Sequence, residues 1–163
     1  MQNNQPYVIT HNQSRTFVQV PIFVDPNSLN TALASVLSNA GYSQTIYSES
    51  GVQEVVWKKG TGMATAMKYI KLMYQPNMLI ISGWLCPGMF SLTICEIPLK
   101  GSYAFIPKKS CMKIVEKLAQ TALTINAQSQ QNYAPQPQQN YAPQPQQDSA
   151  PQPQQNDTSD SRQ

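Results

Sequence analysis

Few side chains in this sequence could take part in catalysis, and their spacing does not match a catalytic pattern. The acids of residues 15–126 are Asp25, Glu49, Glu54, Glu96 and Glu116. No two of them are spaced for joint acid–base work on one substrate. Glu96 interrupts an apolar strand: alternation predicts that it points to solvent, whereas a buried carboxylate there could be functional. We therefore predict no catalytic residue, and a helix-grip enzyme that uses Glu96 or a tyrosine in a cavity stays an alternative.

Metal-binding side chains are equally sparse. Cys86, Cys95 and Cys111 form no C-x-x-C pair, and His11 is the single histidine. Zinc sites need four such ligands at characteristic spacings. We predict no metal and no cofactor, and three buried reduced thiols of the kind found in cytosolic proteins. The N-terminal sequence lacks the basic and apolar regions of a signal peptide, which favours a cytoplasmic location.

Lysines near the start of the last predicted helix are candidates for anion binding. Lys108 and Lys109 follow Pro107 in the first turn, where the helix dipole disfavours cations, and Lys100 lies shortly before. Free amide groups and ammonium groups both attract negative charge, so the three lysines could hold an anion. The alternative is that exposed lysines cost a few tenths of a kcal/mol and have no function.

A second candidate site is an apolar pocket. Methionines and aromatic residues cluster in the strand region, and we select Trp57, Met67, Trp84 and Met89 as pocket candidates. Such side chains adapt to apolar ligands, but they serve equally well as core residues.

The order of predicted elements defines the fold class. A strand over residues 15–24 is followed by a helix that Asp25 caps and Gly41 ends. Pro21 places that strand at a sheet edge or at a bulge. Further strands are predicted at 42–48, 52–58, 66–74, 78–85 and 92–97, with a possible short one at 101–106, before a helix that begins at Pro107.

These elements predict a two-layer α+β domain. An antiparallel sheet of about 5–6 strands would carry the N-terminal helix and the long C-terminal helix on one face. Two arrangements remain open at this stage. The sheet either curls around the last helix as a helix grip, with an internal cavity, or stays an open sandwich.

The chain divides into three regions. We predict a flexible N-terminus at 1–14, the α+β domain at 15–126 and a disordered tail at 127–163. The tail contains three successive octads, NYAPQPQQ, NYAPQPQQ and DSAPQPQQ, between residues 132 and 155. Such a Pro/Gln-rich repeat cannot bury enough apolar surface to fold.

Charge and hydropathy bear on the partners. Before residue 128 there are ten Lys and Arg residues against five acids, so nucleic-acid binding through a basic surface is an alternative. The uncharged run from residue 78 to 95 has the length of a membrane span, but Pro87 and Gly88 favour two strands joined by a turn. We predict no membrane partner.

Several short stretches resemble a small uncharacterised bacterial domain that often occurs beside zinc ribbons. They are WKKG at 57–60, YIK at 69–71, GW at 83–84 and IPKK at 106–109, where a helix follows. The resemblance brings no known activity, and zinc-ribbon cysteines are missing here. It implies a bacterial cytoplasmic unit. Together these features predict a non-enzymatic module that binds a protein partner or a small anionic or apolar ligand.

Overall fold

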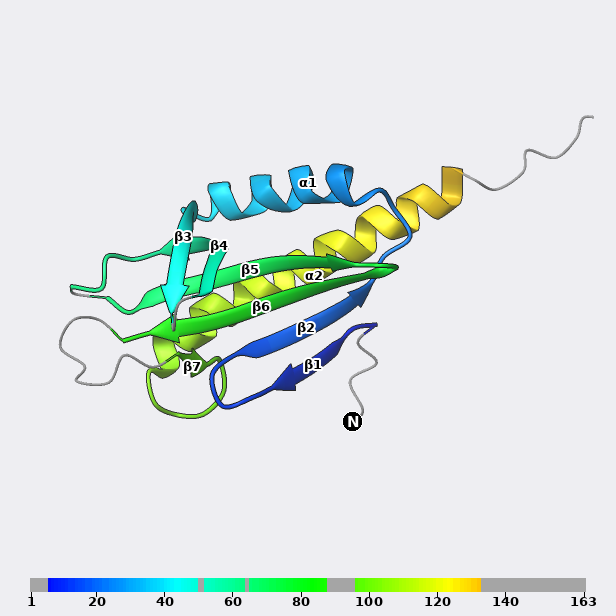
Figure 1. Cartoon of the computed structure of the whole chain (residues 1–163). Helices are drawn as coiled ribbons and strands as arrows, with labels where there is room; N and C mark the ends of the chain where they lie inside the picture. Colours follow the sequence, from blue (N-terminus) through cyan, green and yellow to red (C-terminus); the bar gives the residue numbers. More distant parts are fainter. Residues whose placement is uncertain (1–5, 50–51, 64, 88–95, 133–163) are drawn as a thin grey trace, which may run out of the picture.

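The computed structural model describes residues 6–49, 52–63, 65–87 and 96–132. Along the chain these residues form β1 (Val8–His11), β2 (Thr16–Pro21), α1 (Pro26–Asn39), β3 (Ser43–Glu49), β4 (Val52–Lys59), β5 (Met67–Gln75), β6 (Met78–Cys86), β7 (Ile97–Pro98) and α2 (Phe105–Asn132). The described residues form one sheet and two helices, whose arrangement is drawn in Figure 1. The predicted α+β class is confirmed.

The sheet is antiparallel and open. Its strand order is β1-β2-β6-β5-β4-β3, and the short β7 pairs with the far end of β6. Within the described residues it contains seven strands, one more than the six main predicted ones, because β1 is added at its edge. The two ends of the order, β1 and β3, do not pair with each other in the described structure, so the sheet is open.

Both helices cover the same face of the sheet. The main core joins Leu29, Leu33 and Leu37 of α1 to residues of β2, β6 and α2. Gly83 of β6 allows this close packing: a Cβ there would lie 2.9 Å from Leu99 and 3.0 Å from Val115 of α2. Any larger side chain would push α2 away from the centre of the sheet.

The predicted start and end of α1 are confirmed. The carboxylate of Asp25 accepts a hydrogen bond of 2.8 Å from the backbone N–H of Ser28, and Pro26 occupies the first turn. This hydrogen bond keeps the pKa of Asp25 below its usual value. Gly41, with a φ of 79°, turns the chain out of the helix.

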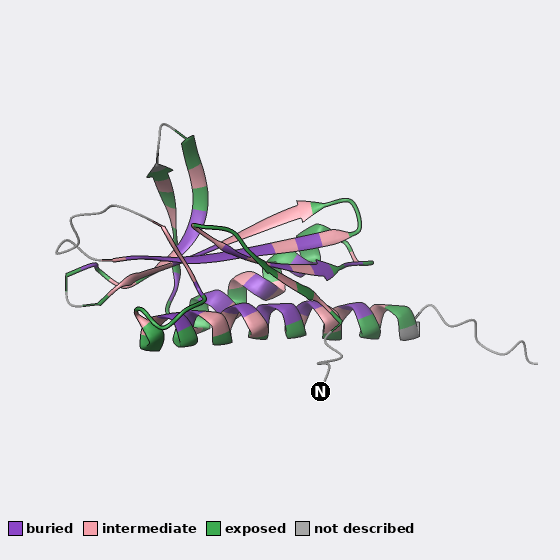
Figure 2. Cartoon of the chain, turned by 90° about the horizontal axis from the view of Figure 1, so that it is seen from below, coloured by how far each residue is buried: buried purple, intermediate pink, exposed green. Residues whose placement is uncertain are grey.

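The face opposite the helices carries a second, smaller cluster of buried residues. Trp84 alternates along β6 with Gly83, so its side chain lies on this other face, where it stacks on Tyr69 at 5.5 Å between ring centroids. The β3–β4 hairpin leaves the plane of the other strands (Figure 2). It brings Tyr47 of β3 to 4.8 Å from Tyr69 and 5.4 Å from Trp84, which covers the cluster.

Three local predictions are wrong at the N-terminal side and around residue 105. Residues 8–11, predicted to be flexible, form β1. β2 lies between β1 and β6 and not at an edge. Pro21 is tolerated because β1 pairs only as far as Gln19, so no described strand needs its missing N–H.

Residues 101–104 form turns, and α2 already begins at Phe105, because Gly101 and Ala104 adopt φ values of 85° and 54° that a strand excludes.

Several predictions concern parts of the chain outside the described residues. The repeat tail beyond residue 132, Met89, Cys95 and the predicted strand residues 92–95 all belong to this group.

Helix α2 runs to Asn132, six residues past the predicted end of the domain. Within the described ranges, no helix combines the length and apolar character that a membrane-spanning helix requires.

Candidate functional site at the start of helix α2

The structure brings Lys100, Lys108 and Lys109 together at the start of α2, but it gives them different environments. Lys108 is almost fully buried, and its ammonium group donates a hydrogen bond of 2.5 Å to the backbone carbonyl of Lys100. Burial lowers the pKa of Lys108. Lys100 and Lys109 are exposed. Lys108 therefore closes the loop before the helix, while the other two remain accessible to a ligand.

A cleft lies beside these lysines. Its volume is about 380 Å³. The lining residues are Leu99, Gly101, Phe105, Lys108, Lys109, Met112, Lys113 and Glu116. Leu99, Phe105 and Met112 supply an apolar surface, and Lys109 and Lys113 supply positive charge. This combination suits a ligand that has both an anionic group and an apolar part.

The lysines of the cleft belong to a longer row on α2. Lys109, Lys113 and Lys117 follow one another at four-residue intervals and are all exposed, so they share one face of the helix. None of them forms an ion pair with a described residue. The ammonium group of Lys109 lies 5.5 Å from the centre of the Phe105 ring, which places charge and aromatic surface side by side.

Sequence reasoning found Lys108 and Lys109 but missed the rest of the cleft. Lys113 lies one helical turn after Lys109, a spacing that could have revealed it. Phe105 falls in the possible short strand at 101–106, which does not predict a position at the start of a helix. Leu99 and Gly101 join the cleft in the segment just before α2, where Gly101 has a φ of 85°.

The predicted pocket residues do not form one site. Trp57 packs in the main core on the helix side, whereas Met67 and Trp84 belong to the small cluster on the opposite face. Met89 lies outside the described residues. The sulfur of Met67 accepts a hydrogen bond of 3.4 Å from the Tyr69 hydroxyl. Three of the four candidates thus contribute to packing on two separate faces of the sheet.

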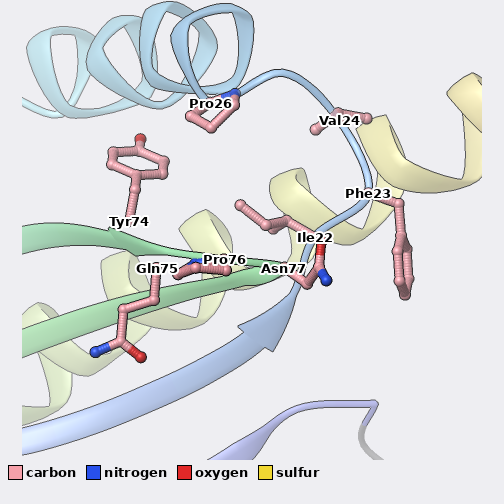
Figure 3. Close-up of a pocket in the computed structure, with 8 residues that line it drawn as sticks. All are labelled: Ile22, Phe23, Val24, Pro26, Tyr74, Gln75, Pro76 and Asn77. Carbon is pink, nitrogen blue, oxygen red and sulfur yellow. The ribbon is translucent and has the colours of Figure 1, made fainter.

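A different pocket lies at the opposite end of the sheet, between the start of α1 and the β5–β6 turn (Figure 3). It has a volume of about 480 Å³ and is lined by Ile22, Phe23, Val24, Pro26, Tyr74, Gln75, Pro76 and Asn77. None of these side chains carries a charge. The Tyr74 hydroxyl, whose pKa is raised to about 12 by burial, donates to Asn30 at 3.2 Å. This pocket therefore lacks a group that would select a ligand by charge.

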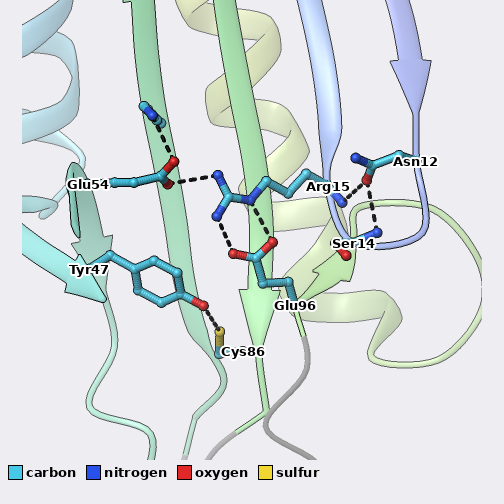
Figure 4. Close-up of polar contacts among 8 residues, drawn as sticks. Asn12, Ser14, Arg15, Tyr47, Glu54, Cys86 and Glu96 are labelled. Atoms are coloured by element: carbon cyan, nitrogen blue, oxygen red, sulfur yellow. Dashed lines mark hydrogen bonds and ion pairs between the residues drawn. The ribbon is translucent and has the colours of Figure 1, made fainter. Parts of the chain in front are cut away.

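Glu96 is part of an ion-pair network and does not point to solvent, so the prediction from strand alternation is wrong. Its carboxylate binds the guanidinium of Arg15, with 2.6 Å between Nε and Oε2 and a second contact through Nη2. Arg15 also binds Glu54 at 2.8 Å, and Lys71 binds the other oxygen of Glu54 at 2.9 Å. Figure 4 shows Arg15 between the two carboxylates.

Electrostatics explain why this network is stable. The Arg15 guanidinium lies 3.9 Å from the centre of the Trp84 ring. Burial alone would lower the pKa of Arg15, but the hydrogen bonds to Glu96 and Glu54 outweigh it and raise the pKa. Burial would raise the pKa of Glu54, yet Lys71 and Arg15 hold it below its usual value. Two positive and two negative charges compensate one another, which leaves no unpaired charge for acid–base chemistry.

The remaining reactive groups are engaged or buried. Cys86 and Cys111 are buried, and Cys86 shares a hydrogen bond of 3.4 Å with the Tyr47 hydroxyl. Burial raises the pKa of the Cys111 thiol to about 11, which makes it unreactive. His11 bonds Thr16 through Nδ1 at 2.9 Å, and burial together with the charge of Lys100 lowers its pKa. Within the described part of the chain, no three His, Cys, Asp or Glu side chains are grouped to hold a metal ion.

Comparison of the chain with protein-family models, with curated proteins and with solved structures gives no match. The site must therefore be interpreted from its own geometry.

Proposed function

We propose that this protein is a non-enzymatic binding module that holds an anionic ligand with an apolar part in the cleft at the start of α2. The observation that carries this proposal is the cleft itself, in which Lys109 and Lys113 face the same space as Phe105 and Met112. An ammonium group beside an apolar surface binds an anion more strongly than it does in open water, because fewer water molecules screen the charge.

A binding role fits the described chemistry better than the enzyme alternative. Glu96, the carboxylate on which an enzyme mechanism would depend, is held by Arg15. Among the described residues that line the cleft, Glu116 is the one acid, and no histidine, cysteine, serine or threonine is present. Glu116 therefore has no imidazole, thiol or hydroxyl side chain beside it in this lining, whereas groups that attract an anion are present.

The test uses hexyl phosphate as a probe, since it combines a phosphate with a short alkyl chain. Isothermal titration calorimetry on the full-length protein should show binding of hexyl phosphate, with weaker binding of inorganic phosphate and of hexanol. Replacing both cleft lysines, Lys109→Gln with Lys113→Gln, should lower the affinity at least about ten-fold, because each lost charge contributes on the order of 1 kcal/mol near a protein surface.

The matched control is Lys117→Gln. This lysine lies on the same helix face and is equally exposed, but it does not line the cleft. The Lys117→Gln variant should bind hexyl phosphate with the affinity of the wild type. Equal affinity for hexyl phosphate in the double variant and the wild type would overturn the proposal. An equal loss of affinity in Lys117→Gln would also overturn it, because the anion would then respond to the charge of the whole helix face and not to the cleft.

A further inference from the structure

An exposed apolar surface adjoins the cleft. Tyr103, Phe105 and Ile106 are 66%, 57% and 80% exposed, respectively, and lie within four residues of one another at the start of α2. Exposed apolar residues that occur singly need no explanation, but three large ones at a single turn indicate a contact surface. We call Tyr103, Phe105 and Ile106 the apolar tip.

Lysines flank the apolar tip on both sides. Lys100 precedes it, and the exposed row of Lys109, Lys113 and Lys117 follows it on α2. Between residues 100 and 117 there are five lysines and one glutamate. By helical spacing, Ile106 lies on the same face as Lys109 and Lys113. The outward side of α2 therefore presents an apolar end followed by a row of positive charges.

We propose that this side of α2 docks on an anionic lipid surface, with the apolar tip at the level of the acyl boundary and the lysines at the phosphate groups. Binding at a lipid interface combines burial of apolar side chains with attraction between basic residues and anionic lipids, and the apolar tip and the lysines supply these two contributions. Each lysine close to an anionic leaflet adds to the attraction. The inference rests on the proposed function, because a lipid headgroup supplies the phosphate and its chain the apolar part that the cleft favours.

The most exposed residue of the apolar tip favours lipid over nucleic acid. Ile106, the most exposed member of the tip, has no aromatic ring that could stack on a base, and stacking is the main apolar contribution to single-strand binding. A lipid interface accepts a protruding aliphatic side chain without a preformed pocket. This proposal departs from the sequence prediction of no membrane partner, and docking at the surface requires no spanning segment.

The experiment is co-sedimentation of the full-length protein with vesicles. One set contains phosphatidylcholine alone, and the other contains equimolar phosphatidylcholine and phosphatidylserine. We expect binding to the second set that weakens as salt is added. Ile106→Ser should reduce vesicle binding about ten-fold, since it removes a side chain that the interface would bury. Its melting temperature should stay unchanged, because Ile106 contributes little to the core.

Two matched measurements keep the result interpretable. Val52→Ser removes another exposed apolar side chain, 60% exposed against 80% for Ile106, from the β3–β4 hairpin and should not change vesicle binding. Ile106 does not line the cleft, so Ile106→Ser should bind hexyl phosphate normally. Equal binding to both vesicle types, or vesicle binding that survives Ile106→Ser, would overturn the docking proposal.

The two proposals can fail separately. Hexyl phosphate binding without vesicle binding would overturn only lipid docking. Vesicle binding that requires Ile106, together with no binding of hexyl phosphate, would support docking through the tip but overturn the cleft as a ligand site. Binding of a single-stranded oligonucleotide in place of vesicles, with the same dependence on Lys109 and Lys113, would identify nucleic acid as the partner and overturn the lipid proposal.

Discussion

Arg15 shows at the level of single residues how this protein handles buried charge. Its guanidinium lies between Glu54 and Glu96 and over the ring of Trp84. These partners come from β4, from the segment before β7 and from β6. An arginine can bind two carboxylates at once because its donors form a rigid fork. The network therefore ties separated parts of the sheet together.

The ion pairs of Glu54 predict a dependence of stability on pH. The pKa of Glu54 is lowered in the folded state from a usual value of 4.5, so the folded form binds protons less readily than the unfolded form. The stability that Glu54 contributes is present above about pH 4.5 and is lost as the pH falls through the lower folded pKa. Urea unfolding of wild type and Glu54→Gln should differ at neutral pH by about 1 kcal/mol, a value reduced by solvent screening.

The difference between the two proteins should shrink as the solution becomes acidic, since protonated glutamate and glutamine are both neutral. Glu116→Gln is the control, because Glu116 forms no ion pair with a described residue, and its replacement should change stability at neutral pH less than Glu54→Gln does. A difference between wild type and Glu54→Gln that stays constant into acid would assign the effect to packing and not to charge.

The sequence predicted which side chains of a strand are buried better than it predicted which distant groups they bind. Alternation along a strand correctly predicted which faces of β2 are buried, since this depends on neighbours two positions apart. It failed for Glu96 because the compensating charge, Arg15, lies 81 residues earlier in the chain. No sequence pattern indicated a partner for Lys108, whose ammonium group donates to a backbone carbonyl at a turn that only the folded loop creates.

The two helices differ in how their boundaries are fixed. The ends of α1 depend on local signals, Asp25 and Gly41, and the sequence predicted them. The start of α2 depends on the positive φ of Ala104, an unusual conformation for alanine that tertiary packing imposes. The far part of α2 is held by Asn126, which is 5% exposed and contacts the segment between β2 and α1.

Asn126→Ala should destabilise the fold by about 1–3 kcal/mol. The side-chain oxygen of Asn126 accepts from the Phe23 N–H at 3.0 Å, and its nitrogen donates to the Pro21 carbonyl at 2.7 Å. Removing the amide leaves two backbone groups without their partner. Urea unfolding measures the loss, and Gln128→Ala, an exposed amide two residues further along α2, should change stability by less than about 0.5 kcal/mol. Equal effects of both substitutions would contradict this role.

At the scale of the whole molecule, the sheet has two unequal cores. The main core joins both helices to the sheet, and the small cluster around Trp84 depends on the β3–β4 hairpin. The hairpin pairs with β5 only at its base, through Trp57, Lys58 and Lys59. β5 and β6, by contrast, pair along their full length. The hairpin is therefore held to the rest of the sheet by fewer backbone pairs than β5 and β6 share with each other.

This asymmetry predicts two levels of stability in hydrogen exchange, because local unfolding follows the density of buried contacts. Amide groups that link β3 to β4 should open at lower free energy than those that link β5 to β6. Tyr47→Ala removes the ring that covers Tyr69 and Trp84 and should speed exchange in the hairpin up to about ten-fold, since an aromatic pair contributes about 0.5–1.5 kcal/mol. Ile46→Ala is the matched control, because Ile46 is its neighbour on the same strand and is largely exposed.

If Tyr47→Ala speeds exchange in β5 and β6 as much as in β3 and β4, the hairpin unfolds only with the whole domain. In that case the small cluster belongs to the main cooperative unit.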